Sequence, residues 1–439
     1  MVDYLEGDAV DHEPNLLFDK FDSSAIHHQV YWGLRKFGPY EKSKSRIKLA
    51  IIAPKDKLIQ TKSIVSDLQS GSISILPGGM KSFFRCELEL VDERVIDKPT
   101  GDAYSKIANE FVAASNPSNL DLVLVNIPKT GQYILDSPYY KVKGTLASAG
   151  FVTQMVTEAT FANLKWSYLN LASGIFSKAG AIPWVLHSPM QNTDMILGIS
   201  KSNILPPDEG PSQMKRYVGH VNVFDNNGKW MTFESNAEPY NPKEKKEIST
   251  KLGELVGRAA AKFRAMKKYE PKKIVLHNSK RFGKEDREAI IASLRANLSD
   301  FNVAFVTIDE SHPFRLYDMS TDDGSFPRGY FAYLDRNDAL LSTTGQSAAG
   351  GRRIGTPKIL HISLYQPLSE FITMEEVVNQ VVGLTKLDWA TSMAFVREPV
   401  TIHFANEVAY LTAALTYSQW RSINGPAINS ILNQRPWFL

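Results

Sequence analysis

Two short apolar runs rich in β-branched residues place the strongest constraint on the fold. They are RIKLAIIAP (46 to 54) and LDLVLVNIPK (120 to 129), and a helical pattern follows the second at 138 to 149. Strands that are apolar along their whole length are typical of a parallel sheet covered by helices on both faces. The first half is therefore predicted to be an α/β domain, whose ligands would gather beyond the carboxyl ends of its strands.

The second half begins with a different pattern. After a strand expected at 194 to 200, the segment 216 to 235 carries Asn-Asn-Gly between two alternating runs, which predicts a β-hairpin. Helices are then expected at 243 to 267 and 285 to 297, and strands at 272 to 279 and 301 to 311. Three antiparallel strands followed by alternating helices and strands is the order of an RNase H-like domain.

The remaining patterns complete these two domains. A strand at 151 to 160 and a helix at 163 to 180 are expected in the first, strands at 329 to 336 and 358 to 364 and helices at 374 to 385 and 403 to 417 in the second. We place the first domain at residues 1–185 and the second at residues 186–439. A chain of 439 residues exceeds what one hydrophobic core usually organises, which agrees with two domains.

Composition narrows the class of protein. The 50 Lys and Arg residues against 47 Asp and Glu give a net charge of +3, so a nucleic-acid site would have to be local rather than a polybasic surface. Cys86 is the only cysteine, which excludes an intramolecular disulfide and a Cys-rich zinc site. The acidic N-terminus does not resemble a signal peptide, and no apolar run has membrane-spanning length. These features favour a cytoplasmic protein.

The stretch DSPYYKVKG (136 to 144) is the first candidate site. If a helix starts at Pro138, Tyr139 and Lys143 lie four residues apart on one face, where a phenol and an ammonium group could hold an anion. On these residues alone, an ordinary solvated first turn is the alternative. The stretch follows a predicted strand of the parallel sheet, which is where ligands of such sheets bind.

Several phrases together resemble the MID and PIWI halves of Argonaute proteins, especially the short prokaryotic forms and a small archaeal PIWI protein. The phrases occur in the order of that family and are GLRKFGPY (33 to 40), YYKVK (139 to 143), SKAGAIPWVL (177 to 186), LGIS (197 to 200), ESHPF (310 to 314), LTKLDW (384 to 389), EPVTIHFANEVA (398 to 409) and the terminal PWFL. The resemblance implies a Rossmann-like MID domain followed by an RNase H-like PIWI domain. It leaves no part of the chain for separate N and PAZ domains.

The resemblance also implies a pocket for the 5′ phosphate of a guide strand. In this family a Tyr and a Lys four residues apart, a later Gln and a Lys before a Gly-x-Pro-Trp segment bind that phosphate, and the matching positions are Tyr139, Lys143, Gln154 and Lys178. Two ammonium groups would neutralise the phosphate, the amide would donate a hydrogen bond, and the phenol could stack on the first base.

A metal ion is implied at the same pocket. In relatives the terminal carboxylate, here that of Leu439, enters the MID pocket and helps hold a divalent cation beside the guide phosphate; Mg²⁺ is the expected ion because it prefers oxygen ligands. The position of a Gln that helps to hold the metal in the archaeal relative is Gly174 here. Simple burial of the apolar tail is the alternative.

The nuclease centre of the family is expected to be degenerate. Slicing members need several carboxylates to hold paired metal ions. The first Asp position matches Ser200, the second Ser279, or Asn278 if the alignment slips by one, and the last Asp or His position matches Asn406. Only Glu247 falls where an acidic residue of active members would be expected, and one Glu cannot assemble the site. The chain is thus predicted to be no enzyme.

These expectations combine into one functional hypothesis. The chain would be an inactive short Argonaute that binds a 5′-phosphorylated guide, RNA rather than DNA, and recognises complementary target DNA. It would signal to an APAZ-containing or other effector protein, such as a TIR, Sir2 or nuclease protein, in prokaryotic defence by abortive infection. Two alternatives remain open. One is a residual guided nuclease that uses Glu247, the nearby histidines His277 and His403 and a carboxylate such as Asp194, and the other is a homodimeric guide- or DNA-binding protein without an effector.

Overall fold

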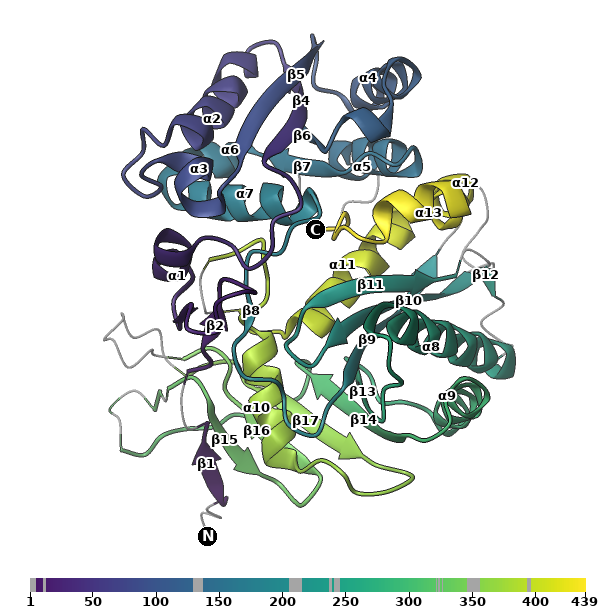
Figure 1. Cartoon of the computed structure of the whole chain (residues 1–439). Helices are drawn as coiled ribbons and strands as arrows, with labels where there is room; N and C mark the ends of the chain where they lie inside the picture. The colour runs from purple at the N-terminus through teal and green to yellow at the C-terminus, as the bar shows by residue number, and fades with distance from the viewer. Residues whose placement is uncertain are drawn as a thin grey trace.

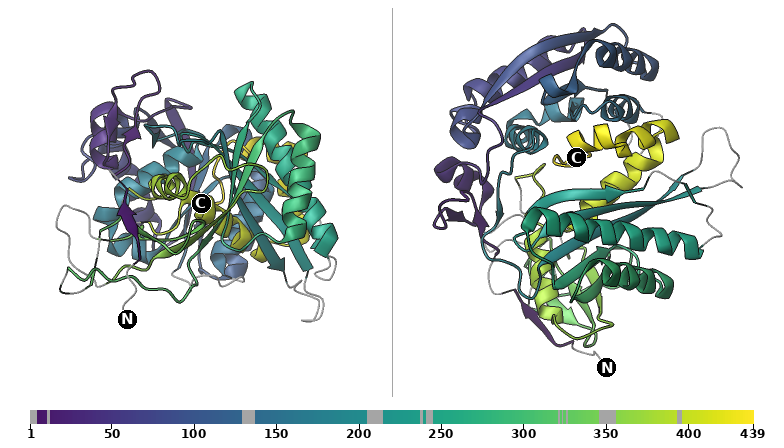
Figure 2. Two further views of the ribbon diagram at one scale, coloured as in Figure 1. Left: turned by 90° about the horizontal axis from the view of Figure 1, so that it is seen from below. Right: turned by 45° about the vertical axis from the view of Figure 1, so that its right-hand side comes forward.

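The structure is a computed structural model that describes residues 5–10, 13–128, 137–204, 215–236, 239–240, 245–320, 322, 324–325, 327–345, 356–392 and 396–439. Two sheets with their helices form two lobes, and the C-terminus lies between them (Figures 1 and 2). The smaller lobe is built from the first half of the chain and the larger lobe mainly from the second half.

The small lobe contains a four-stranded sheet in which every pair of neighbours is parallel. Its strands, in spatial order, are β5 (Glu87–Ile96), β4 (Arg46–Pro54), β6 (Leu122–Asn126) and β7 (Thr153–Val156). Helices cover both faces, with α2 (Leu58–Ser70), α3 (Gly79–Phe84) and α7 (Leu164–Lys178) on one and α4 (Gly101–Ala114) and α5 (Pro138–Ser148) on the other. The parallel α/β fold predicted from the apolar runs is confirmed.

The large lobe is organised by a ten-stranded sheet. Its RNase H-like part consists of β9 (Met195–Ile204), β10 (Lys215–Asp225), β11 (Trp230–Ser235), β13 (Lys273–Asn278) and β14 (Asn302–Asp309). The first three are antiparallel, and β13 and β14 run parallel to β9. This is the predicted order. The sheet continues through β17 (Leu360–Tyr365), β16 (Asp338–Leu341), β15 (Tyr330–Tyr333) and β1 (Gly7–Ala9), while β12 (Pro239–Tyr240) pairs with β10.

Helices also cover both faces of this sheet. On one face lie α8 (Lys245–Lys267) and α9 (Lys284–Asn297), and on the other α10 (Met374–Leu384) and α11 (Val400–Ala414). Gly198 of β9 permits the approach of α11, because a Cβ atom at that position would lie 2.2 Å from the main-chain oxygen of Thr401. No helix in the described part of the chain is long and apolar enough to cross a membrane.

Two sequence expectations need correction. The strand expected at 151 to 160 ends at Val156, because Thr157 begins the short helix α6 (Glu158–Ala162), in which the hydroxyl of Thr160 accepts from the Thr157 main-chain N–H at 3.1 Å. The helix expected at 403 to 417 ends at Ala414 and is followed by two helices that were not predicted, α12 (Tyr417–Asn424) and α13 (Pro426–Leu432).

The N-terminal segment lies along both lobes. Strands β2 (Leu16–Leu17), β3 (Ile26–His27) and β8 (Val185–Leu186) form a small sheet, α1 (Val30–Phe37) follows β3 in the chain, and β1 belongs to the large sheet. The division at residue 185 stays a prediction.

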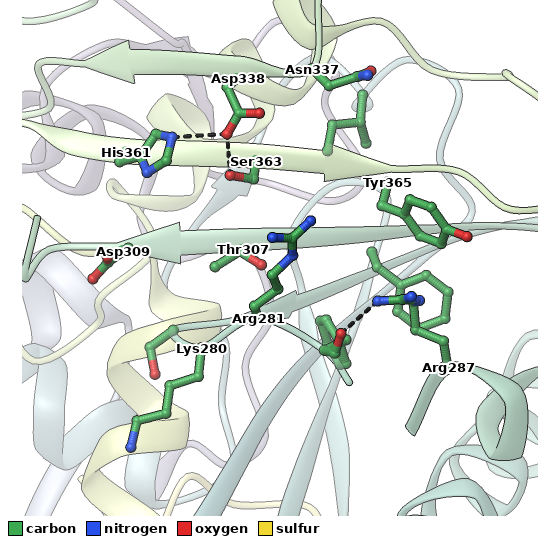
Figure 3. Close-up of a pocket in the computed structure, with 14 residues that line it drawn as sticks. Lys280, Arg281, Arg287, Thr307, Asp309, Asn337, Asp338, His361, Ser363 and Tyr365 are labelled. Atoms are coloured by element: carbon green, nitrogen blue, oxygen red, sulfur yellow. Dashed lines mark hydrogen bonds and ion pairs between the residues drawn. The ribbon is translucent and has the colours of Figure 1, made fainter. Parts of the chain in front are cut away.

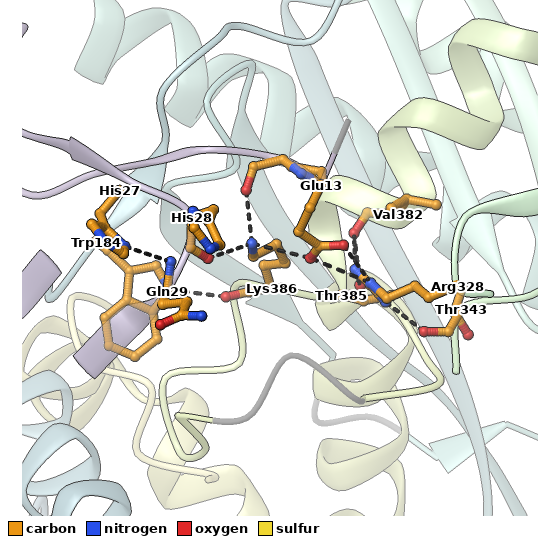
Figure 4. Close-up of polar contacts among 11 residues, drawn as sticks. Glu13, His27, His28, Gln29, Trp184, Arg328, Thr343, Val382, Thr385 and Lys386 are labelled. Carbon is orange, nitrogen blue, oxygen red and sulfur yellow. Dashed lines mark hydrogen bonds and ion pairs between the residues drawn. The ribbon is translucent and has the colours of Figure 1, made fainter. Parts of the chain in front are cut away.

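Glu13 fastens this segment to the large lobe (Figure 4). Its carboxylate pairs with the buried Arg328 and Lys386, both at 3.1 Å, and the Lys386 ammonium also donates to the main-chain oxygens of Pro14 and His28, each at 2.7 Å. Burial opposes ionisation of Glu13, but the two cations outweigh it and hold the pKa of that carboxyl below its usual value.

Candidate functional site

The residues of the candidate anion pocket come from α5, β7 and α7, and the C-terminal tail lies against Lys143 of α5. Helix α5 begins at Pro138, as predicted, and carries Tyr139 and Lys143 on one face. Gln154 comes from β7 and Lys178 from the last turn of α7. Asp136, in the stretch that first indicated this site, lies outside the described residues.

Lys143 is buried and makes three polar contacts. Its Nζ atom donates to the main-chain oxygens of Phe438 and Leu439, at 2.6 and 2.9 Å, and to the Tyr139 hydroxyl at 3.0 Å. Burial lowers the pKa of Lys143 to about 8, although the carboxylate of Glu407 acts in the opposite direction. Burial also raises the pKa of Tyr139, so this phenol keeps its proton and can donate it in a hydrogen bond. The Lys143 side chain is therefore buried, and the alternative of an ordinary solvated first turn does not hold for it.

Lys178 of α7 is also buried, and its charge and that of Lys143 act on each other. Its Nζ atom donates to Oε1 of Gln154 at 2.9 Å. Burial lowers the pKa of Lys178 well below its usual value, and the neighbouring ammonium of Lys143 lowers it further. Two buried amines that disfavour each other's charge would both gain from an anion placed between them.

The tail enters this pocket and is also buried. The side chains of Trp437 and Phe438 are each 1% exposed. The Phe438 ring packs against Phe404 and Trp230 of the large lobe, with centroid separations of 5.4 and 6.1 Å. The tail is buried and its main-chain oxygens contact Lys143, whereas the metal ion weighed against simple burial stays a prediction.

The oxygen donors around the tail fit a metal ion in part. The main-chain oxygen of Leu439 is the kind of ligand that Mg²⁺ prefers, and the Glu407 carboxylate is near enough for its charge to act on Lys143. Gly174 supplies no side-chain ligand, and a Cβ atom there would lie 3.0 Å from Oε1 of Gln154, which already accepts from Lys178. A phosphate would have to supply further oxygens.

Glu407 is a site residue that the sequence analysis missed. It lies on α11, and its charge acts on Lys143 and Lys178 across the boundary between the lobes. The signal was present in the phrase EPVTIHFANEVA, where Glu407 directly follows Asn406, but no spacing rule connects that phrase to α5.

Two of the positions matched to nuclease ligands lie on the same side of the large sheet's interior, toward the carboxyl ends of the neighbouring strands β9 and β13. His277 of β13 is paired with Gly198 of β9, and Ser279 and Ser200 each lie two residues further along these parallel strands. The Ser200 hydroxyl is buried and has no hydrogen-bond partner in the described part of the protein. Asn278, the other possible match, is also buried.

The other two positions are placed differently. Glu247 is exposed near the start of α8, whose apolar side packs on the sheet face opposite α11. Asn406 lies on α11 and donates to the Glu398 carboxylate at 3.2 Å. Asp194, the carboxylate considered for a residual nuclease, accepts from the main-chain N–H groups of Lys272 and Lys273 at 2.8 and 2.9 Å, which is a structural role.

Comparison with known proteins gives relatives of one kind. No protein-family model matches the chain. The Argonaute protein of Cereibacter sphaeroides is 22% identical over 96% of this chain, and that of Aquifex aeolicus is 23% identical over 67%. The chain spans 58% and 39% of the length of these two curated relatives.

Solved structures with the same fold come from both bacteria and animals. Clostridium butyricum Argonaute bound to a guide DNA and a 19-mer target DNA matches with a TM-score of 0.72 and 16% identity, over 94% of this chain and 53% of that one. Drosophila Piwi matches with a TM-score of 0.68 and 16% identity, over 94% and 56%. The two lobes correspond in fold to the MID and PIWI domains predicted from the sequence. This 439-residue chain is thus similar to Argonaute proteins in sequence and shares the fold of their MID and PIWI domains.

Proposed function

We propose that this chain is a guide-binding recognition protein that holds the 5′ phosphate of a small guide strand between α5, α7 and the tail. The observation that carries the proposal is the pair of buried amines, Lys143 and Lys178, which reach one place from two helices. The N-terminal end of α5 would add its free main-chain N–H groups and the positive end of its dipole. The Clostridium butyricum relative, solved with guide and target DNA, supports nucleic acid as the ligand.

The electrostatics of the pocket favour a dianion. Burial alone disfavours the charged forms of Lys143 and Lys178, so the ligand-free pocket is poorly compensated. A terminal phosphate carries nearly two negative charges at neutral pH and offers three acceptor oxygens, whereas a hydroxyl end offers neither. The pocket would therefore select 5′-phosphorylated strands.

Mg²⁺ belongs to this proposal. The Leu439 and Glu407 oxygens would hold it together with the guide phosphate, and the ion would offset repulsion between these anions.

We further propose that the chain recognises a target without cutting it. With Ser200, Ser279 and Asn406 at the matched ligand positions, three carboxylates that would hold paired metal ions are replaced by neutral groups. A guide, RNA rather than DNA by analogy with short prokaryotic Argonautes, would pair with complementary DNA, so that base pairing supplies the sequence selectivity.

Recognition without cleavage requires a second protein to act. We propose an APAZ-containing or other effector that binds the guide–target duplex together with this chain, in the cytoplasm of a prokaryotic cell. The duplex would stabilise the active assembly, because it would bind that state more tightly than the idle state. The output would be defence by abortive infection. Purification from the native host followed by mass spectrometry should recover the effector, and recovery of this chain alone would contradict this part of the proposal.

The pocket is tested with two guides that differ only in their 5′ end. The unmodified protein should bind a 5′-phosphorylated guide more tightly than its 5′-hydroxyl form. Lys143→Ala with Lys178→Ala should remove that preference, with a loss of about a hundredfold or more for the phosphorylated guide, since each charge-assisted contact contributes roughly 1.5 to 3 kcal/mol.

A matched control exists on the same two helices. Lys141 of α5 and Lys165 of α7 lie outside the pocket, Lys141 paired with Asp102 and Lys165 beside Trp166. Lys141→Ala with Lys165→Ala removes the same net charge and should retain the preference. Equal binding of both guide types by the unmodified protein would overturn the pocket assignment.

Cleavage is tested separately. A labelled complementary strand should stay intact when it is incubated with the guide-loaded protein and Mg²⁺ or Mn²⁺, and Ser200→Asp alone should not create cleavage. Cutting at one guide-defined position by the unmodified protein would favour the residual nuclease instead.

A further inference from the structure

A second polar cavity opens at the carboxyl ends of β13 and β14, against β16 and β17, and has a volume of about 630 Å³ (Figure 3). It is lined by the loop after β13, the start of α9 and residues of β14, β16 and β17. Cavities of this size hold ligands as large as a nucleotide. None of the guide-pocket residues lines it, so the two sites are separate.

Two cations at this cavity have no partner. Lys280 and Arg281 follow β13, are exposed, and make no hydrogen bond or ion pair with any residue in the described part of the chain. Arg281 extends from its loop toward β14 and β17 (Figure 3). Unpaired cations at the rim of a concave site attract anions and can donate several hydrogen bonds to them.

A third cation is held in a fixed orientation. The Arg287 guanidinium donates to the main-chain oxygen of Phe282 at 2.6 Å and lies over the ring of Tyr365, 4.4 Å from its centroid. Tyr365 lines the cavity and is 48% exposed, so part of it is open to a ligand. A planar guanidinium stacked on an aromatic ring is a surface on which nucleic-acid bases stack.

The carboxylates at the cavity are already engaged. Asp338 accepts from the Ser363 hydroxyl and from Nε2 of His361, the latter at 2.8 Å, and Asp309 accepts from the main-chain N–H of Ser311 at 2.8 Å. These hydrogen bonds occupy part of the acceptor capacity of both acids, and the three cations at the cavity outnumber the two carboxylates. The groups left to meet a ligand are therefore mainly the cations and the aromatic surface.

We propose that this cavity binds the phosphate of a nucleotide through Lys280 and Arg281, with the base beside Arg287 and Tyr365. The nucleotide is either free or part of a single strand, and both sources present the same phosphate and base. Ser279, the position matched to the second nuclease Asp, also lines the cavity. The proposed site therefore lies next to the two matched nuclease positions on β9 and after β13. The inference does not depend on guide binding.

The test uses the full chain carrying Lys143→Ala and Lys178→Ala, so that the guide pocket cannot contribute. Two probes are titrated: adenosine monophosphate, and a short single-stranded DNA with a 5′-hydroxyl end. At least one should bind, and Lys280→Ala with Arg281→Ala should weaken that binding about a hundredfold, or roughly tenfold for each cation. If the strand binds, the dependence of its affinity on salt should become shallower, because fewer counterions are released.

Two controls separate the site from general charge effects. Lys55 and Arg295 are exposed and lie outside the cavity, so Lys55→Ala with Arg295→Ala should leave binding unchanged. Exchange of the two cations, Lys280→Arg with Arg281→Lys, should keep most of the affinity. Binding of adenosine monophosphate would identify a free-nucleotide site, and binding of the strand alone a strand site. The proposal is overturned if neither probe binds, or if the control pair weakens binding as much as the cavity pair does.

Discussion

The pKa of Lys143 leads to a prediction about pH. Burial places this pKa at about 8, so the ammonium is mostly protonated at pH 7 and only about one tenth protonated at pH 9. A bound phosphate dianion favours the protonated form and raises the pKa in the complex. The affinity for a 5′-phosphorylated guide should therefore fall at least about tenfold between pH 7 and pH 9, or about 1.4 kcal/mol, from Lys143 alone; Lys178, whose pKa is also lowered by burial, would take up a proton with the phosphate and steepen the fall.

The assay compares labelled guides by fluorescence anisotropy at pH 7, 8 and 9 and at constant ionic strength. The 5′-hydroxyl guide serves as the reference, because general effects of pH on nucleic-acid binding cancel in the ratio of the two affinities. Lys143→Arg keeps its charge throughout this range and should make the profile shallower by the Lys143 contribution, leaving the part due to Lys178. A ratio that stays constant from pH 7 to pH 9 in the unmodified protein would refute the reasoning.

The same pKa has a consequence for stability. The unfolded chain binds the Lys143 proton more tightly than the folded chain, since the pKa is about 8 in the fold and 10.5 ordinarily. The free energy of unfolding of the ligand-free protein should thus contain a contribution that rises as the pH increases from about 8 to 10.5. Urea denaturation of Lys143→Met, which cannot titrate, should lack that contribution, and an identical pH dependence in both proteins would contradict it.

Two further substitutions test other contacts. Glu13→Gln should lower the free energy of unfolding, measured in urea, by about 2 kcal/mol, which is less than for a fully buried pair because Glu13 is partly exposed. Glu110→Gln, which removes one partner of an exposed pair, should change it by less than about 0.5 kcal/mol. Equal effects of the two substitutions would refute the role of Glu13. Gly174→Gln should displace Gln154 from Lys178 and add an amide oxygen that can bind the metal ion. Removal of Mg²⁺ with a chelator should therefore weaken guide binding more in the variant than in the unmodified protein. An equal effect in both proteins would count against the metal.

Much of the fold was predictable because it depends on local patterns. The apolar runs at 46 to 54 and 120 to 129 indicated buried parallel strands, and Asn-Asn-Gly placed the turn between β10 and β11, where Gly228 has a φ of 69°. Strand β7 was overextended because Thr157 favours a helix start as well as a strand. The pairing of β1 with β15 could not be predicted, since no local signal connects residues so far apart.

The site was predictable in its residue types but not in its energetics. Tyr139, Lys143, Gln154 and Lys178 were identified by resemblance, and the structure brings them together in two hydrogen-bonded pairs. Their assignment to a guide phosphate remains a prediction. The burial that lowers the pKa of Lys143 comes from a tail 295 residues away in sequence, and spacing within α5 contains no information about it.

The C-terminal tail makes the two lobes one packed body. One continuous hydrophobic core includes Leu49 of the small sheet, Phe176 of α7, Phe404 of α11 and Phe438 of the tail. The centroid of the Phe438 ring also lies 5.9 Å from that of His220. His220 of β10 is paired with Ser200 of β9, the position matched to the first nuclease Asp. Close-packed interiors transmit displacements rather than absorb them. Any ligand that moves the Phe438 oxygen from Lys143 must therefore disturb packing in both lobes, and guide binding and the stability of the large lobe should not be independent.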